Sequence, residues 1–494
     1  MKDEPAMYIG KSLSHYAETQ PDTPAVCFEH TQITYREFRD HIKGISDRLL
    51  QILGEGRRRK VALWLGNRPE FLEAFFTIIR LGWIAVPLDR KWTTAELRHA
   101  MSIACPDAVI AENDSLPEWQ ETLVIPVEQL YQYSAGSSNL PKPPTEDDLF
   151  YLGFTSGTTG KPKGYVRNHG SWLKSFSAGE TAFGFHSGHS VLAPGPLCHS
   201  LSLFAAVHAI HSGSTFYMLE SFDVDKVCRL LKQGCVDMLH VVPTMLEKIM
   251  AQYRWKPIIH QSVKWILASG AYWEENSKER AKQLFPQARL FEYYGASELS
   301  FVAYQEYPAE EKGSKPFPGV HIRICDQAGR DVEPGEIGQV YIDSPLLFSG
   351  YVKDENETKK VLTHFGATVG DMGRMDSQGR LHIVGRRKNM FKSGGLKVYP
   401  EEVEHVIKKH PSVEEAVVIG IKDEYWGEKG VACVQWRKKE SEEEIKRFCR
   451  QHLAAYKCPK QWVEMNNWPL TKSGKIDRFT LKRWLEMVLA CQEQ

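Results

Sequence analysis

A polar segment at residues 155–164 offers the clearest chemistry in this chain, and it follows the apolar stretch 148–154. It reads Thr-Ser-Gly-Thr-Thr-Gly-Lys-Pro-Lys-Gly and so combines hydroxyls, glycines and two lysines. Glycine lets backbone N–H groups turn toward an anion, hydroxyls donate hydrogen bonds, and lysine adds positive charge. A strand that ends in such a loop predicts a phosphate-binding site, and therefore a nucleotide-using enzyme.

This loop does not have the pattern of a Walker A loop. In G-x-x-x-x-G-K-[ST] the first glycine would fall at Thr155, and a serine or threonine would follow Lys161, where this chain has Pro162. Clusters of Gly, Ser and Thr are also common in ordinary surface loops. Taken alone, the segment leaves a phosphate site and a plain surface loop both open.

Four further segments, taken in their order along the chain, help to interpret this loop. They are Tyr-Gly-Ala-Ser-Glu at 294–298, Gly-Asp at 370–371, the basic and glycine-containing stretch 385–404, and Leu-Thr-Lys-Ser-Gly-Lys-Ile-Asp-Arg at 470–478. With the opening loop, these segments resemble the adenylate-forming superfamily of acyl-CoA synthetases, adenylation domains and beetle luciferases. The resemblance covers essentially the whole chain and is greatest to a bacterial-type fatty acyl-CoA ligase.

The resemblance implies a two-step reaction. A carboxylate attacks the α-phosphorus of ATP, which gives an acyl adenylate and pyrophosphate, and a thiol then displaces AMP. The first step brings two anions together, so positioning and charge neutralisation dominate. ATP, Mg²⁺ and CoA are the implied cofactors.

The resemblance also assigns the groups of the first step. Glu298 would hold Mg²⁺, and Lys475 would bridge the reacting carboxylate and the α-phosphate; with Thr159 they form the predicted catalytic set. Their plain alternatives are a solvated acid and a surface lysine. The residues predicted to hold the phosphates are Thr155, Ser156, Gly157, Thr158, Thr159, Gly160 and Lys161.

The nucleoside has its own predicted contacts. Asp371 would accept hydrogen bonds from the ribose hydroxyls and Arg386 would approach the same ribose, although Gly-Asp alone is merely a turn. Tyr294 would pack on adenine, with a core tyrosine as the plain alternative. The other residues predicted around the nucleotide are Gly270, Ala271, Tyr293, Gly295 and Ser297.

The second step is expected to use a rotated C-terminal domain. Lys388 falls at the hinge position of the resembled family, and a charged linker is the compatible plain alternative. Lys392, Gly394 and Gly395 are predicted to line the path of the CoA thiol.

The predicted acyl pocket is mainly apolar and aromatic. Its wall residues would be His199, Leu203, Ser269 and Phe301, together with Tyr293. Amino-acid-activating relatives carry Asp where this chain has His199, so an α-amino acid is not expected. A fatty acid is the preferred substrate, and an aryl acid is the alternative.

The acceptor and the activity have alternatives too. Free CoA is the favoured acceptor because the tail after Lys475 is short, and a carrier protein acting in trans is the alternative. A non-catalytic nucleotide-binding homologue is less consistent with the joint presence of Glu298, Asp371, Arg386 and Lys475.

The elements that position these groups alternate between strand and helix. Residues 60–65 predict a strand, 70–81 an amphipathic helix and 83–87 another strand, which is the pattern of an α/β fold with a helix-covered parallel sheet. We expect a large N-terminal domain at 1–384 with a β-rich subdomain at about 319–384. A hinge at 385–389 and a small mobile α+β domain at 390–494 would follow.

Composition narrows the class of protein. The chain has 494 residues and a formal net charge of zero, which argues against nucleic-acid binding driven by bulk charge. Its ten cysteines include no C-x-x-C pair, and the N-terminus lacks an apolar signal segment, so we expect a cytoplasmic protein with reduced thiols. Residues 181–219 contain no Asp, Glu, Lys or Arg, but prolines and glycines interrupt them, so no membrane span is expected.

Overall fold

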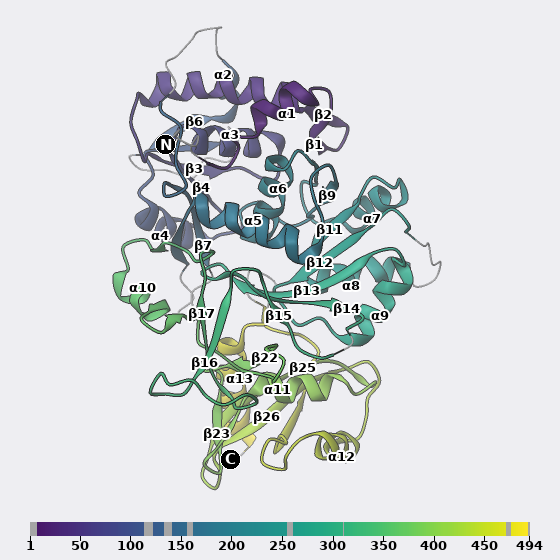
Figure 1. Cartoon of the computed structure of the whole chain (residues 1–494). Helices are drawn as coiled ribbons and strands as arrows, with labels where there is room; N and C mark the ends of the chain where they lie inside the picture. The colour runs from purple at the N-terminus through teal and green to yellow at the C-terminus, as the bar shows by residue number, and fades with distance from the viewer. Residues whose placement is uncertain are drawn as a thin grey trace. The chain divides into compact units, whose positions relative to one another are not determined.

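The computed structural model describes residues 7–112, 122–132, 141–155, 162–253, 260–309, 311–470 and 476–492. The chain divides into two compact units (Figure 1). The first unit contains residues 1–321 and 342–367, and the second contains residues 322–341 and 368–494. The β-rich stretch after residue 319 thus contributes to both units. The expected domain boundaries and the hinge at 385–389 remain predictions.

The first unit holds a sheet of nine described strands, whose central members β1 and β9–β13 run parallel where they pair. In spatial order the strands are β15 (Lys315–Pro316), β14 (Ser300–Tyr307), β13 (Arg289–Ala296), β12 (Trp265–Ser269), β11 (Met238–Val241), β9 (Ser190–Leu192), β10 (Thr215–Met218), β1 (Pro24–Phe28) and β2 (Thr31–Thr34).

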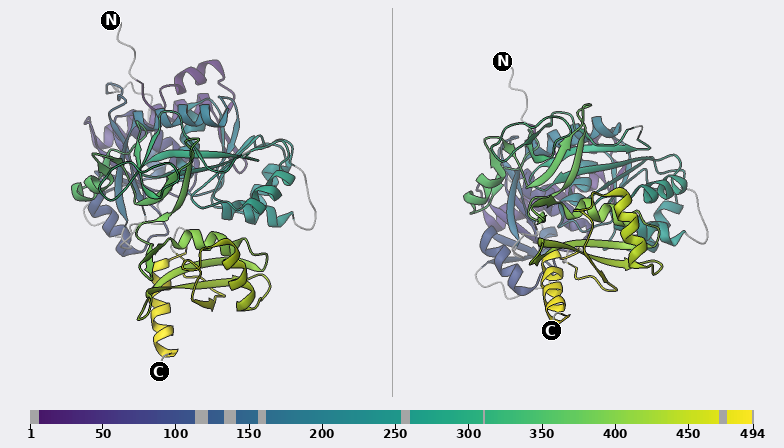
Figure 2. Two further views of the ribbon diagram at one scale, coloured as in Figure 1. Left: turned by 60° about the horizontal axis from the view of Figure 1, so that its bottom comes forward. Right: turned by 90° about the horizontal axis from the view of Figure 1, so that it is seen from below.

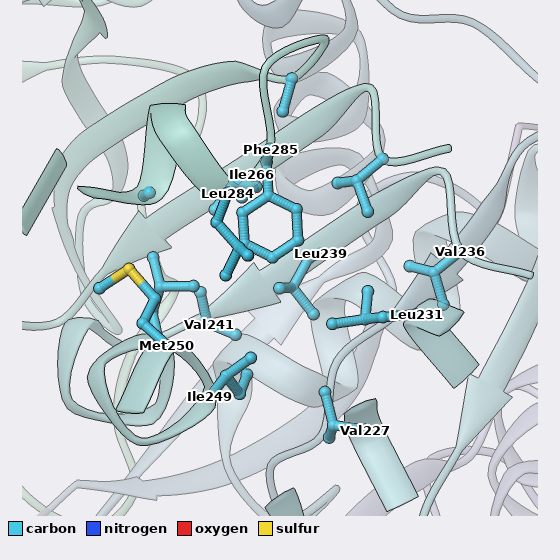
Figure 3. Packing of buried hydrophobic residues seen from close by; sticks show 14 of the residues in the cluster. Val227, Leu231, Val236, Leu239, Val241, Ile249, Met250, Ile266, Leu284 and Phe285 are labelled. Atoms are coloured by element: carbon cyan, nitrogen blue, oxygen red, sulfur yellow. The ribbon is translucent and has the colours of Figure 1, made fainter. Parts of the chain in front are cut away.

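One face of this sheet is covered by α7 (Val224–Lys232), α8 (Pro243–Gln252) and α9 (Glu275–Leu284). Figure 3 shows the resulting core, in which Leu239 and Ile266 from the strands meet Ile249 and Phe285 from the helical layer. The strands are buried on a helix-covered face, which explains why their sequences are short apolar runs.

A second sheet of the first unit carries the segment before the polar loop. Its seven described strands are, in order, β18 (Gly350–Tyr351), β8 (Lys163–Asn168), β7 (Leu149–Thr155), β4 (Ile84–Pro87), β3 (Lys60–Trp64), β5 (Ala108–Ala111) and β6 (Leu123–Pro126). Strands β3 to β7 are parallel where they pair, so their carboxyl ends share one edge. The crossovers use α3 (Pro69–Arg80) and α4 (Thr94–Ala104), and α4 begins at a capping box formed by Thr93 and Glu96.

Helix α5 (His169–Phe183) contacts both β8 of the second sheet and β14 of the first. It therefore lies between the two sheets, as Figure 1 shows. The remaining described helices of this unit are α1 (Leu13–Thr19), α2 (Tyr35–Leu53), η2 (Val127–Tyr131), α6 (Ser200–His211) and α10 (Glu355–Val361).

A further sheet follows in the chain. Its described strands are β19 (Leu362–Thr363), β20 (Gly366–Ala367), β17 (Gly338–Asp343), β21 (Asp371–Met375) and β22 (Leu381–Arg386), with β16 (His321–Cys325) paired to β17.

The C-terminal part of the second unit is a sheet with helices on both faces. Its strands are β24 (Leu396–Val398), β23 (Phe391–Ser393), β26 (Gly427–Trp436), β25 (Val413–Asp423) and β27 (Gln461–Glu464), and its helices are α11 (Pro400–Lys408), α12 (Glu442–His452) and α13 (Arg478–Gln492). Val418 of β25 packs with α11 and α12, whereas its neighbour Ile419 packs with α13, because successive strand side chains point to opposite faces. Helix α13 is the yellow helix in Figure 2.

The α/β class expected from the sequence is confirmed. In the part of the chain that the structure covers, no helix has the length and apolar character needed to cross a membrane.

Candidate active site

The predicted phosphate loop lies in the chain between two paired strands of the first unit. Strand β7 ends at Thr155 and β8 begins at Lys163, and these two residues face each other in an antiparallel ladder. Strand β7 thus delivers the loop to the carboxyl edge of its sheet. The predicted phosphate ligands Ser156, Gly157, Thr158, Thr159, Gly160 and Lys161 lie outside the described residues.

The predicted magnesium ligand Glu298 is connected to that same hairpin. Its side chain is 8% exposed, and its Oε1 accepts a 2.6 Å hydrogen bond from the Tyr351 hydroxyl. Tyr351 lies on β18, opposite Tyr165 of β8, so the carboxylate is fixed beside the strand that leaves the phosphate loop. Burial, followed by the Glu298 charge, raises the pKa of Tyr351, which keeps the phenol a proton donor.

A buried arginine supports the segment that carries Glu298. Arg167 is 2% exposed, and its guanidinium donates to the carbonyl oxygen of Ser297 at 2.9 Å and to that of Leu346. Burial lowers the pKa of Arg167 to about 10, which leaves it charged at neutral pH. The guanidinium therefore cross-links β8 to the backbone at the predicted metal site.

The predicted adenine-binding residues lie at neighbouring strand ends. Ser269 ends β12 and donates a 2.8 Å hydrogen bond to the carbonyl oxygen of Tyr293 on β13. Gly270 follows with φ +88°, a conformation that favours glycine, and exposed Ala271 comes next. The structure therefore brings Gly270, Ala271, Tyr293 and Tyr294 to one edge of the nine-stranded sheet.

Position 295 requires a glycine because the backbone of Ser300 lies close to it. The β13–β14 ladder changes register between Tyr294 and Gly295. A Cβ atom at Gly295 would lie 2.2 Å from the carbonyl oxygen of Ser300, so no larger residue fits this bulge. The bulge lets the hairpin bend on its way to Ser297 and Glu298.

The expected acyl-pocket residues differ in exposure. Leu203 is fully buried on α6, and Phe301 is 6% exposed and stacks on Phe317 with ring centroids 4.6 Å apart. Phe301 also meets Tyr293 edge-on at 5.1 Å. Leu203 is therefore a buried side chain of α6, and Phe301 is packed among aromatic rings.

His199 is the polar, accessible member of that predicted pocket. Its side chain is 43% exposed, and its Nε2 lies 3.4 Å from Oδ2 of buried Asp89. Burial opposes ionisation of Asp89, but the hydrogen bonds from His199 and the Lys91 N–H outweigh it and lower its pKa. An ionised carboxylate thus fixes the imidazole where α6 begins.

The second unit brings together the predicted ribose ligands. Asp371 and Arg386 are paired across the β21–β22 ladder, and the guanidinium Nε donates to Oδ1 of Asp371 at 3.1 Å. The turn after β22 holds Lys388, whose pKa is lowered first by partial removal from water and then by the Arg386 charge. Its role as a hinge remains a prediction.

The predicted CoA path contains a tight turn. Lys392 lies on β23, and Gly394 and Gly395 form the two-residue connection to β24 with φ values of +58° and +81°. Two left-handed residues in succession give the primed turn that suits a β-hairpin. No atom lies within 4 Å of a Cβ built at Gly395, so this position faces open space. Lys475, the predicted adenylation lysine, lies outside the described residues.

The sequence did not single out Tyr351, Arg167 or Asp89. An arginine directly after Tyr165 and Val166, in the strand that follows the predicted phosphate loop, was a signal for Arg167. Tyr351 and Asp89 lie in no motif, and only the folded chain brings them to their partners.

Comparisons with known proteins identify the class. Residues 13–352 match the AMP-binding enzyme family, and residues 402–475 match the AMP-binding enzyme C-terminal domain. The chain therefore belongs to the AMP-binding enzyme family. The prediction of an AMP-forming acid–thiol ligase is confirmed at this level.

Individual relatives match over nearly the whole chain. The uncharacterised acyl-CoA ligase YhfT of Bacillus subtilis is 36% identical over 97% of this chain and 99% of its own. The putative long chain fatty acid-CoA ligase VraA of Staphylococcus epidermidis is 29% identical over 96% of this chain and 98% of its own.

A solved structure adds the ligands of a relative. o-Succinylbenzoate CoA synthetase (MenE) of Bacillus subtilis, in complex with its acyl-adenylate intermediate, is 27% identical with a TM-score of 0.86 and covers 95% of this chain and 97% of its own. The same enzyme has been solved with ATP and a magnesium ion, likewise with a TM-score of 0.86. ATP, Mg²⁺ and CoA, the predicted cofactors, are those of such ligases.

Proposed function

We propose that this enzyme ligates an apolar carboxylic acid to CoA through an acyl adenylate, with a fatty acid as the preferred substrate and an aryl acid as the alternative. The observation that carries the first half-reaction is the placement of buried Glu298 beside the β7–β8 hairpin through Tyr351. A carboxylate next to a phosphate loop is suited to hold Mg²⁺. The bound ion would neutralise the triphosphate and favour departure of pyrophosphate.

Other residues of this chain would bind the ribose, assist adenylation and admit the thiol. Asp371 and Arg386 suit a ribose, since a buried carboxylate accepts hydrogen bonds from adjacent hydroxyls. Lys475 would bring its ammonium to the carboxylate and the α-phosphate, and the glycine turn after Lys392 would admit the thiol.

The preference for an apolar acid rests on the surroundings of the predicted pocket. Phe301, Tyr293 and Phe317 form an aromatic cluster, to which Phe204 adds a ring at 5.2 Å from Phe301. His199 is the accessible polar group and is already engaged by Asp89. Aromatic and aliphatic walls favour hydrocarbon chains or rings.

The test is pyrophosphate release over a panel of fatty, aryl and amino acids, with and without CoA. We expect turnover with fatty or aryl acids that depends on CoA, and acyl-CoA as the product. A burst of acyl adenylate with no CoA-dependent turnover would favour loading of a carrier protein. Preference for an amino acid, or no activity with any acid, would contradict the proposal.

A variant separates the two half-reactions. Lys475→Ala should slow adenylate formation strongly but spare thioester formation from supplied acyl adenylate. Equal loss of both steps would contradict the assignment of Lys475 to the first step alone.

A further inference from the structure

Three different metal-ligating side chains converge where α6 begins. The carboxylate of Asp89, the thiol of Cys198 and the imidazole of His199 place one potential ligand atom each within 4.8 Å of the others. Asp89 is buried, and Cys198 and His199 are half-buried. This cluster is separate from Glu298, the predicted magnesium ligand.

The backbone around the cluster is anchored from both sides. Asn67 is 7% exposed and accepts a 2.8 Å hydrogen bond from the N–H of Leu197, the residue before Cys198. Its amide donates to the carbonyl oxygens of Gly195 at 2.9 Å and Leu219 at 3.0 Å. Asn67 therefore fixes the loop that carries Cys198.

Asp89 is fixed in the neighbouring strand connection. Its Oδ1 accepts a 2.9 Å hydrogen bond from the N–H of Lys91, which leaves Oδ2 directed at His199. Asp89 follows β4 and Asn67 follows β3, and these strands are adjacent and parallel. Asp89 thus lies at a strand end of the seven-stranded sheet, whereas Cys198 and His199 lie in the connection from β9 of the nine-stranded sheet to α6.

We propose that Asp89, Cys198 and His199 form a binding site for a zinc ion. Zinc prefers nitrogen, sulfur and carboxylate ligands in tetrahedral geometry, and accessible sites use three protein ligands and leave the fourth position open. At zinc–nitrogen and zinc–oxygen distances of about 2.0–2.2 Å, two tetrahedral ligands lie roughly 3.4 Å apart. The 3.4 Å separation of His199 Nε2 and Asp89 Oδ2 already has this value.

The ligand set also selects against magnesium. Thiolate and imidazole suit zinc, whereas magnesium takes oxygen ligands in octahedral geometry. On binding, the Cys198 thiol releases its proton to water and the thiolate coordinates the ion. Neither metal nor cysteine changes oxidation state.

Zinc at this site would act on the acid-binding step, a consequence that rests on the proposed function. His199 is the accessible polar member of the predicted acyl pocket, so a coordinated His199 would hold an ion at the pocket wall. We expect zinc to inhibit pyrophosphate release, with the inhibition relieved by higher acid concentration.

The decisive measurement needs no activity. Metal-free full-length protein is titrated with Co²⁺ in a thiol-free reducing buffer while thiolate-to-cobalt charge-transfer absorption is recorded, and Zn²⁺ is then added to displace it. Zinc affinity is measured by competition with a chromophoric chelator. We expect one cobalt per chain with a thiolate band that zinc abolishes.

Variants assign the ligands. Cys198→Ser should lose the thiolate band, and Asp89→Asn should weaken zinc binding by more than about tenfold, because even outer-shell partners of metal ligands contribute that much. Cys235→Ser is the matched control, since this partly exposed cysteine of the same unit lies outside the cluster, and it should behave as wild type. His199→Gln provides a second ligand variant if Cys198→Ser fails to fold.

Three outcomes would overturn the site. These are no cobalt binding by the wild type, a thiolate band that survives in Cys198→Ser, and equal zinc affinity in wild type and Asp89→Asn. Cobalt binding without ligase activity on any acid would leave the zinc site standing and reject the proposed function alone.

Discussion

The Tyr351 hydroxyl donates a 2.6 Å hydrogen bond to Oε1 of Glu298 and ties the predicted metal ligand to β18, which pairs with β8. The backbone of Glu298 is held as well: its carbonyl oxygen accepts a 2.9 Å hydrogen bond from the N–H of Phe348. Contacts within the first unit therefore hold both the side chain and the backbone of Glu298.

Replacing Tyr351 by phenylalanine should lower the apparent affinity of the enzyme for Mg²⁺. The ring remains but the hydrogen bond to Glu298 is lost, and loss of such an outer-shell partner reduces metal affinity or activity by about 10–100-fold. Pyrophosphate release measured against Mg²⁺ concentration should show a higher half-saturation value. Tyr425→Phe, at an 83% exposed tyrosine, is the control, and an unchanged Mg²⁺ dependence in Tyr351→Phe would refute the idea.

Arg167→Met should lower both stability and adenylation rate. The change leaves the carbonyl oxygens of Ser297 and Leu346 without their guanidinium donor. Although the variant no longer buries a charge, we expect the free energy of unfolding to fall by about 1–3 kcal/mol. Denaturant midpoints and pyrophosphate release measure the two effects. Arg280→Met removes an exposed ion pair with Glu247 and should change either by little. Comparable stability of the two variants would show that Arg167 is not a structural clamp.

Gly395→Leu should slow transfer to CoA more than adenylate formation. The new side chain would extend into open space on the predicted thiol path. Gly379→Leu is the matched control because Gly379 also has a left-handed φ, +74°, and open space around its Cβ position. Both variants carry similar backbone strain. Thioester formation from supplied acyl adenylate should fall only in Gly395→Leu, and equal rates would reject this path.

The His41–Glu73 pair should make stability depend on pH. The pKa of His41 is raised, mainly by its 2.7 Å hydrogen bond to buried Glu73. Partial burial acts in the opposite direction but is the smaller effect. A raised native pKa gives stabilisation that is complete below the unfolded value of about 6.5 and is lost as pH rises through the native value. The denaturant midpoint of wild type should thus exceed that of His41→Gln most at about pH 6 and progressively less toward about pH 8.5. A constant difference across this range would contradict the linkage.

The sequence was most informative where periodicity is strong. The strand expected at 60–65 is observed at Lys60–Trp64, and the helix expected at 70–81 is observed at Pro69–Arg80. Helix α13 was missed in the tail after residue 478, although Leu481, Leu485 and Leu489 recur every four residues and face one core. That spacing was the available signal.

The site was predictable only in part. Motifs led to Asp371 and Arg386, which prove to be directly paired across neighbouring strands. The contacts of Arg167 with Ser297 and of Asp89 with His199 join residues more than a hundred positions apart, and no local pattern encodes them. Only the tertiary fold brings such partners together.

Helix α5 lies between the sheet that carries the predicted phosphate loop and the sheet that carries the predicted adenine-binding residues, and this position matters for engineering. A Cβ added at Gly179 on this helix would lie 3.1 Å from Phe301, in the predicted acyl pocket. Enlarging that residue to exclude bulky acids would push on a helix that contacts both sheets of the predicted nucleotide site. Attempts to narrow the acid range through α5 should therefore raise the ATP requirement as well, whereas changes on α6 should alter acid choice more independently.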